Sequence, residues 1–273
     1  MQNARVSFLC QWAEQDDRVR SVAFSGERVN KAAVLYPSDP YCLTFGVTKP
    51  ESFVQETDWE QVFQTALLQK DSVGGEPLQI RLLFDDLTRI DISIVSSEEM
   101  AGLIERDTLM RIRFDKDGIL NVETQPTDLS HRTARPTPEQ YRLWCATFFK
   151  EVTDVALSLQ EGELLPAQRA LDRARKPLIK MTEAAVASTA EYHLNFGPDD
   201  RNLKAYMDAK EYDHLMRSYA FSDIDRIWDA LFQSCMLFRR AGLRLDETGD
   251  FTYPRKMDVS IMQHFRTLWE ESR

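Results

Sequence analysis

The period of the apolar residues changes partway along this chain, and that change constrains the fold more than any other feature. In the first part, apolar residues alternate with polar ones in short segments such as 41–47 and 89–95. From residue 138 onward they recur every three or four residues. Alternation is typical of half-buried strands, and the longer spacing is typical of amphipathic helices. The sequence therefore predicts an α+β protein, with a sheet in its first part and a helical bundle in its second.

The segment "TQPTDLSHRTARPTPEQ", residues 124–140, separates the two patterns. It contains three prolines and has no apolar periodicity, which is typical of a linker. A chain of 273 residues is long enough for two modest domains. We therefore predict one domain over 1–133 and a helical domain over 134–273.

Several elements of the first part can be placed from local signals. The strands 78–84 and 89–95 flank "DDLT", whose paired aspartates suit a turn, so they are predicted to form a hairpin. In its second strand Ile90, Ile92 and Ile94 share one face, and Asp91 and Ser93 lie on the other. The remaining predictions are helices at 4–18, 58–70 and 95–107 and strands at 21–24, 41–47 and 110–120.

Five helical segments are predicted in the second part: 139–160, 164–193, 202–219, 223–245 and 259–273. The first has Thr137 as a candidate N-cap, Pro138 at the first helical position and Gln140 completing a capping box. Pro177 lies inside the second. A proline there removes a backbone hydrogen bond and is expected to kink or break the helix, at a cost of about 3 kcal/mol if unaccommodated.

Composition excludes several classes of function. The net charge of −10 argues against nucleic acid as a main partner, because phosphate binding needs clustered Lys and Arg. The four cysteines have no CxxC spacing and the four histidines no HxxxH or HExxH pattern, so neither a disulfide framework nor a structural zinc site is expected. No apolar run approaches the roughly 18 residues that span a bilayer, and the N-terminal residues lack a secretory pattern. We expect a cytoplasmic protein with no membrane partner.

The order and spacing of seven strings give the chain a resemblance to a known family. It resembles the aminoglycoside 6-adenylyltransferases, also called streptomycin adenylyltransferases, over nearly its whole length. The strings are "AEQDDRVRSVAFSGERVN", "DWEQVF", "LLFDDLTRIDISIV", "DKDGIL", "PTDLSHRTARPTPEQY", "GELLPAQRALDRARKPLIKM" and "IWDALFQSCMLFRR".

This resemblance implies a nucleotidyltransferase-fold domain with a mixed sheet, followed by an all-helical domain, with the active-site cleft between them. The family transfers AMP from ATP–Mg²⁺ to a hydroxyl group of the drug. A Gly-Ser pair after the first strand binds phosphate, and an Asp-x-Asp on the next strand together with a third Asp on a later strand holds metal. Mg²⁺ prefers such hard oxygen ligands.

The chain departs from this pattern at the metal and phosphate positions. The third Asp matches Asp91. A gapless alignment through "SGERVN" sets Glu27 at the family's Ser, and Pro40 and Cys42 at the Asp-x-Asp. Proline is not a ligand, cysteine is a soft one, and Glu27 repels phosphate. The resemblance therefore implies a divergent member of the family with a degenerate metal site. We expect no cofactor for such a protein. If the enzyme is active, we expect it to use Mg²⁺ and ATP.

Two further positions bear on this interpretation. Asp39, next to Pro40, could join Asp91 as a metal ligand if the start of the strand bulged, although a one-residue slip otherwise turns its side chain to the wrong face. In the helical part, Pro177, Ala184 and Ala187 replace the family's Glu, aromatic residue and Gly, and Arg201 takes the place of a lysine. The candidate ligand contacts, expected to line the inter-domain cleft, are Gly26, Glu27, Arg28, Cys42, Thr44, Ser93, Glu183 and Arg201.

Three hypotheses remain open. The favoured one is a catalytically degenerate protein that binds a small ligand or a partner, and we expect uncompensated negative charge from Glu27 and Asp91 to favour a neutral or cationic ligand. The second is an active enzyme that transfers AMP to a hydroxyl of an aminoglycoside or another small molecule, with Asp91 as its catalytic carboxylate. The third is a scaffold whose apolar surface pairs with another protein or a second copy.

Overall fold

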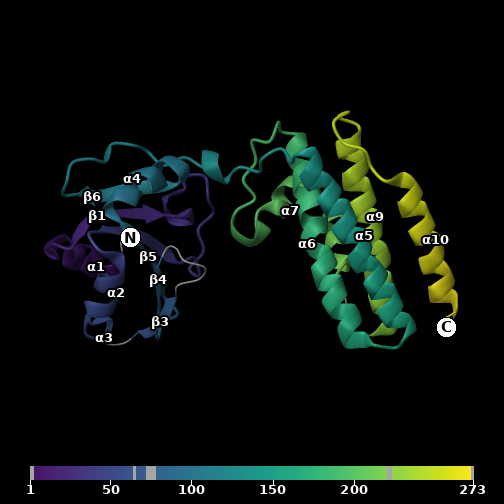
Figure 1. The fold of residues 1–273 in the computed structure, drawn as a ribbon, viewed down its shortest axis with the longest axis horizontal. Coiled ribbons are helices and arrows are strands. Elements are labelled where there is room, and N and C mark those ends of the chain that lie inside the picture. Colours follow the sequence, from purple (N-terminus) through teal and green to yellow (C-terminus); the bar gives the residue numbers. More distant parts are fainter. Residues whose placement is uncertain (1–2, 64–65, 72–77, 220–222, 272–273) are drawn as a thin grey trace. The chain divides into compact units, whose positions relative to one another are not determined.

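The computed structural model describes residues 3–63, 66–71, 78–219 and 223–271 (Figure 1). The chain folds into two compact units, Met1–His131 and Arg132–Arg273. The first contains a sheet and helices. The second contains helices and, among its described residues, no strand. The α+β prediction is confirmed.

A six-stranded sheet organises the first unit, in the order β3-β4-β5-β2-β1-β6. The strands β2 and β5 pair in parallel, and the other neighbours pair antiparallel. The hairpin predicted around "DDLT" is present as β4 and β5. The elements in order are α1 Ala4–Gln15, β1 Val19–Ser25, η1 Glu27–Val29, β2 Tyr41–Val47, α2 Pro50–Glu56, α3 Trp59–Val62, β3 Leu67–Asp71, β4 Leu78–Leu83, β5 Arg89–Ser96, α4 Ser97–Arg106, β6 Met110–Asp115 and η2 Leu129–His131.

The two faces of this sheet are covered differently. One face carries the larger apolar core, in which Leu43, Phe45 and the three isoleucines of β5 pack with residues of α1, α2 and α3. On the other face, Ala23 and Val95 form a small cluster with Met100 of α4 and Met110. The polar residues of β5 lie on this second face, as their alternation predicted.

The helix predicted over 58–70 is wrong. Among the residues of this segment that the structure describes, Trp59–Val62 is helical, and Leu67–Asp71 is a strand that pairs with β4 along its whole length. The residues of this segment favour a helix, but the neighbouring strand offers a complete ladder of backbone partners. Tertiary pairing overrides local propensity at such a position.

The second unit is built on helices α5, α6, α9 and α10, which lie side by side (Figure 1). Its core includes the stacked rings of Phe148 and Phe238, whose centroids are 3.8 Å apart. The capping box of Thr137 and Gln140 is confirmed. The elements are α5 Pro138–Gln160, α6 Leu164–Ser188, η3 Pro198–Asp200, α7 Leu203–Tyr206, α8 Ala209–Arg217, α9 Ile224–Asp246 and α10 Arg255–Glu271.

Three helix predictions in this unit need correction. Helix α6 runs through Pro177 without a break, and it ends at Ser188 instead of continuing to residue 193. The segment 202–219 is two short helices, because Asp208 leaves the helical conformation and its side chain caps the start of α8. The last helix begins at Arg255, four residues earlier than predicted.

Candidate functional site

A row of four residues crosses the sheet on the face that carries α4. Cys42 on β2 lies directly opposite Asp91 on β5. On their outer sides, Cys42 pairs with Ser25 on β1, and Asp91 pairs with Arg81 on β4. Directly opposed residues point to the same face of a sheet, so the row presents hydroxyl, thiol, carboxyl and guanidinium groups together. The structure thus brings together Cys42 and Asp91, two of the residues nominated from the sequence.

The neighbouring row is less accessible. It pairs Thr44 with Ser93, again across β2 and β5. Thr44 is only 4% exposed, whereas Ser93 is half-buried. Of these two nominated residues, Ser93 is therefore the one that a ligand on this face can reach.

The turn after β1 brings Gly26 against the row. Gly26 has φ 74° and ψ −163°, a conformation that is essentially restricted to glycine. A Cβ atom at this position would lie 3.5 Å from the Cys42 sulfur. Glu27 follows directly and begins η1. Gly26 is therefore adjacent to Cys42.

Arg28 stabilises the start of β2. Its Nη2 donates to the carbonyl of Asp39 at 2.6 Å, and its Nε donates to the carbonyl of Pro40 at 3.2 Å. Its guanidinium also lies over the Tyr41 ring, 3.8 Å from the centroid. These contacts give Arg28 a structural role that the sequence analysis did not anticipate.

Asp39 is engaged in the same turn. It is 8% exposed, and its Oδ2 accepts a hydrogen bond from the Tyr36 backbone N–H at 2.7 Å. Its own N–H donates to the Tyr36 carbonyl. The carboxylate that could have replaced a missing metal ligand therefore stabilises the loop that leads into β2.

The charges around the row are balanced. Burial raises the pKa of the Asp91 carboxyl, and Arg81 and Arg89 oppose that shift. Burial and the nearby Asp91 together raise the pKa of the Cys42 thiol to about 11, although Arg28 and Arg89 lower it. The sequence analysis expected uncompensated negative charge here. That expectation is corrected by the three arginines, which β4, β5 and the turn after β1 bring to the row.

The residues of the row do not fit a Mg²⁺ ion. Mg²⁺ requires several hard oxygen ligands in octahedral geometry. Cys42 offers a protonated thiol at neutral pH, Pro40 offers no side-chain donor, and Asp91 is the single carboxylate of the row. Among the described residues, no group of three or more His, Cys, Asp or Glu side chains is placed to hold a metal ion.

The other two nominated residues lie in the second unit. Glu183 is on α6 and only 4% exposed, and its carboxylate accepts a hydrogen bond from Lys180 Nζ at 2.8 Å. Arg201 directly follows η3 and is half-buried. Burial raises the pKa of the Glu183 carboxyl to about 7, and Asp200, next to Arg201 in sequence, adds to that rise. This places the two nominated residues in one neighbourhood of the helical unit.

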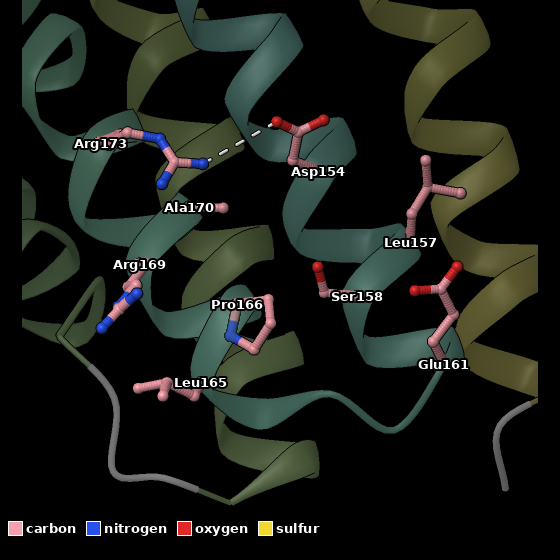
Figure 2. A pocket seen from close by; sticks show the side chains of 9 residues that line it. All are labelled: Asp154, Leu157, Ser158, Glu161, Leu165, Pro166, Arg169, Ala170 and Arg173. Atoms are coloured by element: carbon pink, nitrogen blue, oxygen red, sulfur yellow. Dashed lines mark ion pairs between the residues drawn. The ribbon is translucent and has the colours of Figure 1, made fainter.

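The helical unit also has a cavity that the sequence did not indicate. It lies between the end of α5 and the start of α6, and has a volume of about 520 Å³ (Figure 2). Its polar lining comes from Asp154, Ser158 and Glu161 on one helix and from Arg169 and Arg173 on the other. Arg173 lies 3.9 Å from Asp154 and hydrogen-bonds Glu151 at 2.7 Å. Arg173 and Asp154, two of the four charged residues of this lining, therefore help to join the two helices.

The comparisons with known proteins show the family of this chain. The family model described as streptomycin adenylyltransferase matches residues 2–268, and the chain belongs to that family. The chain is 26% identical to an aminoglycoside 6-adenylyltransferase of Bacillus subtilis (strain 168), over 89% of both chains. It is 25% identical to one of Campylobacter jejuni, over 89% of this chain and 87% of the other.

Two further similarities are more distant. An aminoglycoside 6-adenylyltransferase of Staphylococcus aureus is 21% identical over 97% of both chains. A crystal structure of an aminoglycoside 6-adenyltransferase from Bacillus subtilis matches 98% of this chain and 99% of that one, with a TM-score of 0.49 and 22% identity. No helix in the described part of the chain is long and apolar enough to cross a membrane.

The sequence analysis missed two residues of the row, Ser25 and Arg81. Arg81 is the one that could have been found. A signal for it was present, because the register of a hairpin follows from its turn. The pairing of Leu83 with Arg89 next to the turn sets Arg81 opposite Asp91 two residues further along.

Proposed function

We propose that this family member has kept the adenylyltransferase scaffold but does not transfer AMP, and that it acts by binding a small molecule. Residues 1–133 would form the nucleotidyltransferase-like domain, and 134–273 the helical domain. The observation that carries the proposal is the Cys42–Asp91 pair. A thiol stands beside Asp91 at a position where the family resemblance implies a metal-binding carboxylate.

The expected loss of activity is large. Removing two of three carboxylate ligands takes away the groups that hold Mg²⁺ against the triphosphate. This should cost several kcal/mol of transition-state stabilisation, or roughly a thousandfold or more in rate. Because arginines balance the charge of the row, ATP would be disfavoured by the missing metal ligands and not by simple repulsion. The ligand of this site would then be a small polar molecule that needs no metal bridge.

An active enzyme is the alternative, and one observation favours it. Asp91 is retained and half-buried in a polar row, on a chain that matches the family over nearly its whole length. In that case Asp91 would act with Mg²⁺ and ATP, and Asp39 or Glu27 would have to supply the second carboxylate. The hydrogen bonds of Asp39 to Tyr36 make it a poor candidate.

The decisive experiment measures pyrophosphate release from ATP and Mg²⁺ with and without streptomycin, alongside calorimetry with ATP and Mg²⁺. We expect no streptomycin-dependent release and no magnesium-dependent ATP binding. Asp91→Asn is the matched variant, because it removes the one retained carboxylate and keeps its shape. Release that depends on streptomycin and disappears in Asp91→Asn would establish the enzyme instead. Light scattering of the same sample would reveal the self-association expected of a scaffold.

A further inference from the structure

The cavity between α5 and α6 is bounded on one side by a balanced network of ion pairs. Arg173 on α6 contacts two carboxylates of α5, Glu151 at 2.7 Å and Asp154 at 3.9 Å. Lys150 contacts the same two carboxylates, at 3.0 Å and 2.7 Å. Two positive and two negative charges therefore compensate one another. Asp154 and Arg173, which both line the cavity, are already paired and do not need a ligand to neutralise them.

The cavity exists because short side chains follow this network toward the turn between the helices. Residues 161–163 join α5 to α6, and so short a connection makes the two helices antiparallel. Next to the turn the lining includes Ser158 on α5 and Pro166 and Ala170 on α6. None of these side chains is long enough to reach across to the other helix, so a space of about 520 Å³ remains between them. Cavities that bind small molecules commonly have volumes of about 300–1,000 Å³.

The other two charged residues of the lining are Glu161 and Arg169. Figure 2 shows them on opposite sides of the cavity, with Pro166 between them. Among the lining residues one ion pair is formed, that of Arg173 and Asp154. Glu161 and Arg169 therefore bring one negative and one positive charge to the cavity, and neither is neutralised by another residue of the lining.

This arrangement selects the chemistry of a ligand. A molecule that is only anionic or only cationic would leave one of the two charges uncompensated and repel it. Because Glu161 and Arg169 lie on opposite sides, the two charges of the ligand have to be separated as well. A free α-amino acid carries both charges on one carbon atom, whereas two extended peptide residues span about 7 Å. Leu157 and Leu165 are exposed and line the same cavity, so they offer apolar surface to the middle of the ligand.

We propose that this cavity binds a short zwitterion of about the size of a dipeptide, with a carboxylate at one end, an ammonium group at the other and apolar groups between them. Arg169 holds the carboxylate, because its guanidinium donates two parallel hydrogen bonds that match a carboxylate. Glu161 accepts hydrogen bonds from the ammonium group, and the Ser158 hydroxyl donates to a carbonyl of the ligand. The proposal stands whether or not the sheet face of the first unit binds a ligand.

Calorimetry of the full chain with the dipeptide Leu-Leu tests this site. Three related compounds serve as matched probes: N-acetyl-Leu-Leu lacks the ammonium group, Leu-Leu amide lacks the carboxylate, and free leucine brings the two charges together. We expect Leu-Leu to bind, and each of the others to bind about tenfold more weakly or worse, because each loses a charge-assisted hydrogen bond. No binding of Leu-Leu at millimolar concentration would overturn the proposal, as would a related compound that binds as tightly as Leu-Leu.

Two variants locate the binding in this cavity. Arg169→Gln should weaken the binding of Leu-Leu about tenfold or more and leave that of Leu-Leu amide unchanged, because the amide has no carboxylate to lose. Glu161→Gln should do the same to Leu-Leu and leave N-acetyl-Leu-Leu unchanged. Both side chains are exposed, so neither substitution disturbs the core. Arg142→Gln, at an exposed position near the other end of α5, is the control and should bind Leu-Leu like the wild type. Wild-type affinity in either cavity variant, or an equal loss in Arg142→Gln, would overturn the proposal.

Discussion

Cys42 and Asp91 lie directly opposite each other on the parallel strands β2 and β5. Asp91 adds to the rise that burial causes in the pKa of the Cys42 thiol, since a carboxylate next to a thiol disfavours the thiolate. The position directly opposite Asp91 therefore carries a neutral group at physiological pH.

The reactivity of Cys42 should report on this contact. The pKa of the thiol is raised to about 11 by burial and by Asp91, so its alkylation at neutral pH should be slow. Asp91→Asn removes the negative charge, lowers the pKa of Cys42 and should speed alkylation by about threefold to tenfold. Mass spectrometry of the Cys42 peptide measures the rate. Asp85→Asn, at an exposed position of the hairpin turn, should leave the rate unchanged. An Asp91→Asn rate equal to that of the wild type would contradict this electrostatic account.

Restoring the carboxylates should restore cation binding. In the double variant Pro40→Asp, Cys42→Asp, the carboxylate introduced on β2 would face Asp91, and like charges directly opposite destabilise a sheet by about 0.2–1 kcal/mol. Mg²⁺ or Mn²⁺ should reverse that loss and raise the melting temperature, while the wild type should show no shift. Cys42→Ser is the matched control, because it changes the side chain without adding charge. A wild-type shift as large as that of the double variant would show that the native row already binds the cation.

Gly26 should tolerate no side chain, for reasons of backbone conformation. Its φ and ψ are restricted to glycine, and the nearest contact of an added Cβ, 3.5 Å from Cys42 Sγ, is ordinary van der Waals contact. Gly26→Ala should therefore lower the free energy of unfolding by about 1–3 kcal/mol through backbone strain. Urea denaturation measures this. Gly118→Ala has a positive φ of 66° with no neighbouring atom, and should cost less. An equal cost at both positions would mean that the ψ angle of Gly26 is unimportant.

Pro177 should lower the stability of α6. The helix continues through it, but the carbonyl of Arg173 lacks the N–H partner that any other residue would provide at this position. Pro177→Ala should raise the free energy of unfolding by about 1–3 kcal/mol. Pro166→Ala, in the first turn of the same helix, is the control, since proline is tolerated there. If Pro177→Ala instead destabilised the protein, the packing of the buried proline ring would outweigh the missing hydrogen bond.

The features predicted correctly from the sequence are those set by local chemistry. The "DDLT" hairpin and the Thr137 capping box each depend on residues a few positions apart. The prediction of a helix over 58–70 was wrong because part of this segment pairs with β4. That strand supplies backbone hydrogen-bond partners that no local sequence signal reveals. Pro177 was expected to interrupt α6, yet that helix packs against both α5 and α9, and this packing holds it together.

The candidate site, too, could be predicted from the sequence only in part. The family resemblance indicated Cys42 and Asp91 as neighbours, but the residue alternation alone could not pair β2 with β5. The charge balance was missed because Arg81, Arg89 and Arg28 reach the row from three different elements.

The parallel pairing of β2 and β5 has a consequence for how the first unit assembles. Parallel neighbours cannot be joined by a tight turn, and the chain forms α2, α3, β3 and β4 between them. Contacts between segments so distant in sequence form slowly, because the loop must close before they stabilise the chain. The β4–β5 hairpin can form early, whereas the Cys42 thiol becomes shielded only when β5 docks beside β2. The time at which the Cys42 thiol becomes protected during refolding therefore reports when β5 docks beside β2.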